Sequence, residues 1–182
     1  MIRHAARIVT LALLLVAGVA VWRLYDLYGP HPPAPAPAPA PLSERIDLIE
    51  VDKSERRLTV YRNGAALRSY QVALGFAPDG DKVQEGDGRT PEGEFVIDRR
   101  NPGSSFHLSL GIDYPQPEDI ARAAALGVSP GGDIFFHGQA NLLSHIERRK
   151  GDWTAGCIAL TNAEIEELWR VTQIGTRVVI RP

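Results

Sequence analysis

Apolar and polar positions alternate over 46–51 and 57–62, which predicts two strands. A third strand is expected over 66–74 after a hairpin, and further candidate strands lie over 93–99, 107–112, 133–138, 157–160 and 176–181. Asn63-Gly64 lies between two of these runs and is a strong two-residue hairpin signal. The pattern therefore predicts a mainly β domain with a few helices, an α+β fold.

Helical spacing is found in two places between these strands. The first helix is predicted to begin at Pro117, before two acidic residues that suit a helix N-terminus, and to end at Gly127. The second has Asn162 as its candidate cap and Gly175 as its end. Its apolar face contains Ile165, Leu168, Trp169 and Thr172, so we expect Trp169 in the core. A third, shorter helix over 139–149 remains an option.

The first 28 residues follow another pattern. Arg3 and Arg7 precede a run without charge from Ile8 to Trp22. Positive charge before an apolar run places the rest of the chain outside the cytoplasm. The run is shorter than the roughly 20 residues of a membrane span, and Gly18-Val19-Ala20 offers small residues for cleavage. We expect residues 1–28 to be a signal peptide or an N-terminal membrane anchor, and both remain open.

Residues 29–42 form a Pro/Ala-rich tract, which cannot build regular backbone hydrogen bonds or a core and is predicted to be a linker. The rest, 43–182, is long enough for one folded domain. The 20 basic and 22 acidic residues nearly balance. Because no basic run is flanked by aromatic residues, we expect no nucleic-acid partner.

Cys157 is the only cysteine of the chain. In an exported protein it has no internal disulfide partner, which leaves an inert buried thiol or a reactive one. Gly156 allows close backbone approach, the Thr154-Ala155 pair is small, and an apolar strand follows. This setting favours a thiol that is presented at the mouth of a strand.

A nucleophilic cysteine usually needs a neighbouring imidazole, because a free thiol is mostly protonated at neutral pH. His137 ends the apolar run Ile134-Phe135-Phe136 and is followed by Gly138. A histidine at such a place is often a structural, hydrogen-bonded residue. Beside a single exported cysteine at another strand end, we interpret His137 as the base.

Several motifs together resemble one family. Phe136-His137-Gly138 is followed about twenty residues later by the run from Asp152 to Asn162, and upstream lie the runs Gly86–Phe95 and Phe106–Pro115. In this order they resemble the YkuD-type L,D-transpeptidase domain, most closely the branch typified by the murein transpeptidase YafK. The resemblance covers 46–182 and implies a YkuD-type β-sandwich fold.

The chain departs from the family pattern at two positions. Most members have Ser-His-Gly-Cys, then an aliphatic residue and Arg, whereas this chain has Ala155 and Ala159 at the second histidine and the arginine. The nucleophile and the upstream histidine carry over to Cys157 and His137. His107 either replaces the missing imidazole in part or is structural. Candidate substrate-binding residues are Gly138, Thr154, Gly156 and His107.

The resemblance implies an enzyme of peptidoglycan synthesis and cell shape, without metal or cofactor. Cys157 would attack the carbonyl of the third residue, a diamino acid, of a stem tetrapeptide, and D-alanine would leave from a thioester intermediate. Backbone amides of Gly156 and Cys157 are the expected oxyanion donors. The acceptor would be an amine of another stem or of a wall-linked lipoprotein. The expected location is the periplasm or cell envelope, with the inner membrane as partner if residues 1–28 are retained.

Three alternatives remain. Water as acceptor would make the protein a peptidoglycan hydrolase or amidase that cleaves such cross-links. A catalytically silent wall-binding module would not use its thiol. A metal site would draw on His107, His137, His145 and Cys157, although their spacings match no compact ligand motif.

Overall fold

The computed structural model describes residues 2–28, 41–143 and 148–182. It divides into two units, Met1–Ala40 and Pro41–Pro182. In the first unit, helix α1 (Ile2–Tyr28) coincides with the apolar N-terminal segment. Within the described ranges, no helix has both the length and the apolar character needed to cross a membrane. All but the last two residues of the predicted linker lie outside the described ranges.

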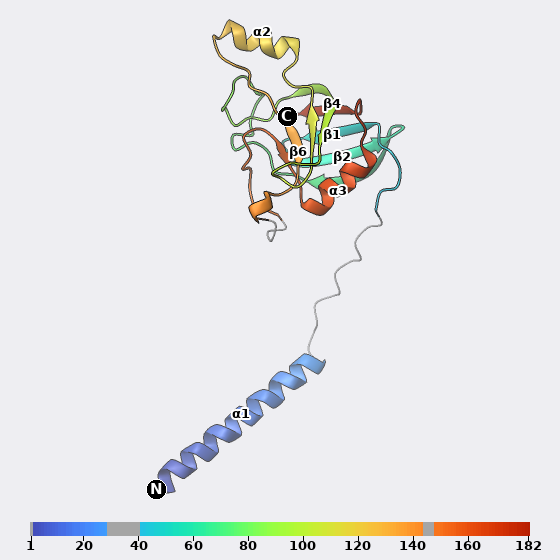
Figure 1. The fold of residues 1–182 in the computed structure, drawn as a ribbon. Coiled ribbons are helices and arrows are strands. Elements are labelled where there is room, and N and C mark those ends of the chain that lie inside the picture. The colour runs from blue at the N-terminus through green and yellow to red at the C-terminus, as the bar shows by residue number, and fades with distance from the viewer. Residues whose placement is uncertain (1, 29–40, 144–147) are drawn as a thin grey trace. The chain divides into compact units, whose positions relative to one another are not determined.

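The second unit is built on one sheet (Figure 1). Its strand order is β3-β2-β1-β8-β4-β5-β6-β7. The pairings β1–β8 and β6–β7 are parallel, and the others are antiparallel. Each strand predicted from the sequence is present, with ends that shift by a few residues. The strands are β1 (Leu48–Asp52), β2 (Arg57–Arg62), β3 (Ala65–Gln71), β4 (Gly93–Asn101), β5 (Ser109–Ile112), β6 (Phe135–His137), β7 (Ile158–Ala159) and β8 (Arg177–Arg181).

The sheet curls until its two edges meet. After β3 the chain continues to Ala73, which pairs with Ala159 of β7 through two backbone hydrogen bonds of 3.0 and 2.8 Å. This bridge pairs the backbone of Ala159 in the edge strand β7, which would otherwise be open to pairing with another chain there. It also fixes β7, and with it the residue directly before β7, from both sides.

Alternation along the strands explains the core. In β1 and β2 the side chains of Ile49, Val51, Leu58 and Val60 have no exposed surface, whereas their neighbours face outward. Each fully buried aliphatic side chain contributes about 1.5–3 kcal/mol relative to exposure. Asn63 and Gly64 have positive φ angles, 50° and 77°, as the predicted tight hairpin requires. The prediction of a mainly β fold with a few helices is confirmed.

Both predicted helices are present as α2 (Pro117–Ala125) and α3 (Asn162–Val171) (Figure 1). The cap of α3 is Thr161 rather than Asn162, because Thr161 and Glu164 form a reciprocal capping box. The helix also ends well before Gly175. Trp169 packs against the core, as predicted.

The described part of 139–149 holds a single 3-10 turn, η1 (Asn141–Leu143), and residues 144–147 lie outside the description.

Candidate active site

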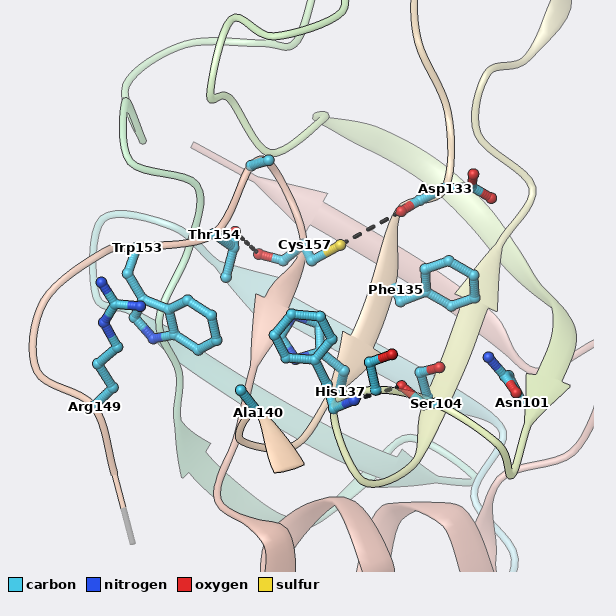
Figure 2. Close-up of a pocket in the computed structure, with 14 residues that line it drawn as sticks. Asn101, Ser104, Asp133, Phe135, His137, Ala140, Arg149, Trp153, Thr154 and Cys157 are labelled. Carbon is cyan, nitrogen blue, oxygen red and sulfur yellow. Dashed lines mark hydrogen bonds between the residues drawn. The ribbon is translucent and has the colours of Figure 1, made fainter. Parts of the chain in front are cut away.

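The parallel pairing of β6 and β7 brings the predicted nucleophile and base to one surface. Phe136 pairs with Ile158 and His137 with Ala159, and Cys157 directly precedes β7. Because side chains alternate along a strand, Cys157 and His137 lie on the same face of this pair. Both line a cavity of 540 Å³ (Figure 2).

Thr154 shapes the turn that carries the thiol. Its hydroxyl accepts a hydrogen bond from the Gly156 N–H (3.1 Å) and donates one to the Cys157 carbonyl (2.7 Å). Its side chain is buried and also lines the cavity. Both bonds fix the turn, so the hydroxyl has a positioning role. The first bond engages the Gly156 N–H, which is one of the two expected oxyanion donors. The other expected donor, the Cys157 N–H, takes part in neither bond.

Gly156 is required by its surroundings. Its φ angle is +134°, and a Cβ atom there would lie 2.6 Å from the Arg89 carbonyl oxygen. Arg89 belongs to the loop before β4, which also holds Thr90, whose hydroxyl accepts from the Gly75 N–H. The upstream Gly86–Phe95 motif thus lies directly against the turn of Cys157 and supports it.

The Cys157 thiol is held as a neutral group. Its Sγ donates to the Asp133 carbonyl oxygen at 3.4 Å, and the side chain is only partly exposed. Burial raises the pKa of the thiol above its ordinary 9.0, and a hydrogen bond from the Phe135 amide offsets only part of that rise. Asp133 itself has a positive φ of 56° and a carboxylate that is 89% exposed, 3.2 Å from Arg99.

His137 is fixed by a hydrogen bond and two aromatic rings. Its Nδ1 lies 2.7 Å from the Gly138 carbonyl oxygen, and because a carbonyl only accepts, Nδ1 carries the proton. The centroid of Phe106 lies 4.6 Å and that of Trp153 5.7 Å from the centroid of the imidazole. Burial lowers the pKa of His137 below its ordinary 6.5. At neutral pH the ring is therefore neutral, with Nε2 as its basic nitrogen.

A neutral thiol and a neutral imidazole in one cavity can act together as nucleophile and general base. The thiol hydrogen bond runs to Asp133 rather than to His137. Contacts of this kind often tighten only when substrate is present. The arrangement suits proton transfer during attack on a carbonyl rather than a preformed thiolate.

The remaining predicted residues lie elsewhere. Neither Gly138, Gly156 nor His107 lines the cavity. A Cβ at Gly138 would lie 2.5 Å from Asn162 Oδ1 of α3, so this glycine permits close packing. The Nε2 atom of His107 lies 2.7 Å from a carboxylate oxygen of Glu166. The ring of His107 is therefore engaged by Glu166 outside the cavity. His145, another histidine of the metal alternative, lies outside the described residues.

The cavity contains residues that the sequence reasoning did not single out, among them Asp133, Phe106, Arg149 and Trp153. Trp153 comes directly before the Thr154–Cys157 turn, and Asp133 follows two glycines. These positions, beside the Cys157 turn and after a glycine pair, are the sequence features that could have indicated the two residues. Cys157 and Asp133 also line a second cavity of 340 Å³, together with Lys82 and Glu85.

Comparison with known proteins agrees with this architecture. YafK of Escherichia coli (strain K12), whose L,D-transpeptidase assignment is itself provisional, is 26% identical over 128 residues, which cover 67% of this chain and 45% of YafK. The chain thus spans less than half the length of this relative. The helical cell shape determining protein Pgp2 of Campylobacter jejuni superposes with a TM-score of 0.59 at 26% identity, over 76% of this chain and 48% of Pgp2.

A more distant solved structure shows the same fold. The L,D-transpeptidase of Xylanimonas cellulosilytica superposes with a TM-score of 0.50 at 20% identity, over 80% of this chain and 65% of that one. The family model for the L,D-transpeptidase catalytic domain, YkuD, matches residues 46–180, which include the Cys157 turn and all of the curled sheet except the last residue of β8. The chain therefore belongs to the YkuD family of L,D-transpeptidase catalytic domains.

Proposed function

We propose that this protein is a peptidoglycan L,D-transpeptidase of the cell envelope, with Cys157 as nucleophile and His137 as general base. The observation that carries the proposal is the 540 Å³ cavity that holds both side chains, with the imidazole proton fixed on Nδ1. Pgp2, the relative named for cell shape, supports a role in the same process. The apolar N-terminal segment after Arg3 and Arg7 favours export, and peptidoglycan lies outside the cytoplasm.

The proposed reaction has two halves. Nε2 of His137 takes the thiol proton while Sγ of Cys157 attacks the carbonyl carbon of the diamino acid in a stem tetrapeptide. The new S–C bond forms a tetrahedral intermediate, the C–N bond to D-alanine breaks, and His137 returns the proton to the leaving amine. In the second half an acceptor amine in its neutral form attacks the thioester, and His137 takes a proton from the amine nitrogen. The new C–N bond forms, the C–S bond breaks, and His137 passes the proton to the departing sulfur, which restores the thiol.

The developing oxyanion needs a donor that is already in place. The Gly156 N–H donates to Thr154, so the Cys157 N–H is the proposed donor of the turn. Losing one oxyanion-hole donor typically costs about 10²–10³ in rate. Thr154 contributes indirectly, because its two bonds hold the turn in the geometry that presents this amide.

The acceptor is proposed to enter through the second cavity. This cavity of 340 Å³ reaches Cys157 from beside Ala155 and includes the exposed carboxylates of Glu85 and of Asp133, the second of which pairs with Arg99. Carboxylates attract a cationic amine, which suits the side chain of a diamino acid on another stem or a lysine of a wall-linked lipoprotein. An acceptor that can reach the thioester favours transfer over hydrolysis by water.

Intact-mass spectrometry of the full chain with a purified disaccharide tetrapeptide tests the proposal. The expected result is a mass increase on Cys157 with loss of D-alanine, followed by a cross-linked product. Cys157→Ala should form no adduct, and His137→Ala should form it much more slowly. Cleavage without joining would favour the hydrolase. A chain that gives no adduct with any wall fragment would overturn the enzymatic proposal.

A further inference from the structure

One end of the 540 Å³ cavity is made by Arg149 and Trp153. The guanidinium carbon of Arg149 lies 4.9 Å from the centre of the Trp153 ring, so the cation stacks on the indole (Figure 2). Both residues line the cavity with Cys157 and His137. Neither residue has a role in the reaction proposed above.

Arg149 and its neighbour Arg148 carry the same charge but differ in their partners. Both oxygens of Glu164 accept from the Arg148 guanidinium, at 2.7 and 2.8 Å, and Arg148 also donates to the Gln71 carbonyl. Within the described residues, the Arg149 guanidinium has no carboxylate partner, and its side chain is exposed. Two adjacent arginines thus provide one satisfied structural cation and one cation at the cavity that is available to a ligand.

Trp153 adds an independent sign of a missing partner. Its Nε1 atom is buried, yet no hydrogen-bond acceptor reaches it within the described part of the chain. An indole N–H can only donate, and a buried donor without a partner is costly. Because the atom has almost no exposed surface, a ligand acceptor satisfies it once the side chains around it, Arg149 on the ring face among them, move aside.

We infer that Arg149 and Trp153 form a subsite for a carboxylate of the stem peptide, and this inference rests on the proposed function. Both groups only donate, and a carboxylate only accepts. A guanidinium fork also matches carboxylate geometry better than other anion-binding side chains do.

The stem carries more than one carboxylate, at the terminal D-alanine and farther along the peptide. The chemistry of the subsite is the same for each, so amidating one carboxylate at a time identifies the one that binds. Affinity is measured by calorimetry on the full chain with Cys157→Ala, which prevents turnover. We expect amidation of the recognised carboxylate to weaken binding about tenfold or more, as loss of a charge-assisted hydrogen bond does.

Variants then assign that preference to the two side chains. Arg149→Gln should bind the acid and the amide equally, whereas Arg149→Lys, which keeps the charge but loses the fork, should keep part of the preference. Trp153→Phe keeps a ring and removes the N–H, so it should also reduce the preference. Arg148→Gln is the matched control and should discriminate like the parent. In NMR spectra the Trp153 indole N–H signal should shift on addition of the acid.

Two results would overturn the inference: equal affinity of the parent for every amide and for the acid, or an acid preference that survives in Arg149→Gln. Acylation of the chain with native Cys157 is followed separately by mass. Acylation without acid preference would leave the transpeptidase standing and remove the subsite. Acid-selective binding without acylation would leave the subsite standing and remove the transpeptidase.

Discussion

Two regions next to the Cys157 turn, the supporting loop and the cavity, differ in whether their buried polar groups have hydrogen-bond partners. In the loop that supports the turn, the buried Lys82 donates to Asp87 at 2.9 Å and to the Gln84 carbonyl at 3.0 Å. Asp87 also accepts from the amides of Val83, Gln84 and Arg89. In the cavity, by contrast, Trp153 Nε1 is buried without a described partner.

The pKa values show the same division. Burial by itself would raise the pKa of Asp87, but the hydrogen bonds from Gln84, Lys82, Val83 and Arg89 outweigh it and lower that pKa to about 2. At Cys157 and His137 burial prevails, so that both pKa values shift toward the neutral form. Charged groups that have hydrogen-bond partners support the turn, whereas the proposed nucleophile and base in the cavity are uncharged. Stability and reactivity are therefore expected to respond to different substitutions.

The largest expected effect is on catalysis. His137→Ala removes the proposed base and should lower kcat/KM by about 10²–10⁴-fold, the usual contribution of general acid–base catalysis. The measurement is the rate of D-alanine release from a tetrapeptide. Thermal unfolding serves as the control, because a chain that is simply unfolded would lose its cooperative transition. A folded variant with native kcat/KM would contradict the role of His137.

The reactivity of the thiol with pH tests the neutral resting state. A raised Cys157 pKa means that less than about 1% is thiolate at pH 7, so alkylation by iodoacetamide should rise with pH and show a midpoint above 9.0. The acid limb of kcat/KM should fall only below pH 6.5, because His137 has a lowered pKa. An alkylation midpoint below pH 8 would instead indicate a preformed thiolate–imidazolium pair.

Most of the fold follows from local patterns in the sequence. Alternation predicted β1 and β2, which each have one face in the core, and Asn63-Gly64 predicted the β2–β3 hairpin. The strands after β3 were predicted as further candidates, and two of them, β5 and β7, are buried at every position. The α3 cap was assigned to Asn162 rather than Thr161 because both residue types cap helices and only the structure shows which side chain faces Glu164. Asn162 accepts instead from the Gln139 amide, a contact between elements that no local pattern contains.

The sequence predicted only those site residues that lie at the end of a strand. Cys157 and His137 flank buried strands, and the pairing of β6 with β7 then brings them together. Arg149 and Trp153 could not be found in this way, because Arg149 lies in a loop beside the equally basic Arg148. Which arginine finds a carboxylate depends on the placement of Glu164 in α3. The contact between His107 and Glu166 could not be predicted either, because it joins residues far apart in the chain.

Asp87 provides the next test, on stability. Its pKa falls from 3.8 to about 2 on folding, which corresponds to roughly 2 kcal/mol at about 1.4 kcal/mol per unit. Because the folded pKa is depressed, this stability is present above pH 3.8 and is lost as the pH falls toward 2. Asp87→Asn should therefore destabilise the chain by about 2 kcal/mol at pH 7, and by much less at pH 2. Urea unfolding at both pH values measures this, and an equal loss at both would contradict it.

The smallest expected effect is on the stability of two variants, Tyr70→Phe and Trp153→Phe, each of which loses the polar group of an aromatic side chain. Tyr70 donates its hydroxyl to Glu167 at 2.8 Å, whereas Trp153 Nε1 has no described partner. Tyr70→Phe should cost about 1–3 kcal/mol, because it leaves Glu167 without one of its donors. Trp153→Phe removes a donor that folding leaves unpaired, so the stability of the free chain should stay within about 1 kcal/mol of the parent or rise. Urea unfolding of both variants measures the difference. If Trp153→Phe costs as much as Tyr70→Phe, its N–H has a partner in the free protein, and the contrast between the supporting loop and the cavity does not hold at that atom.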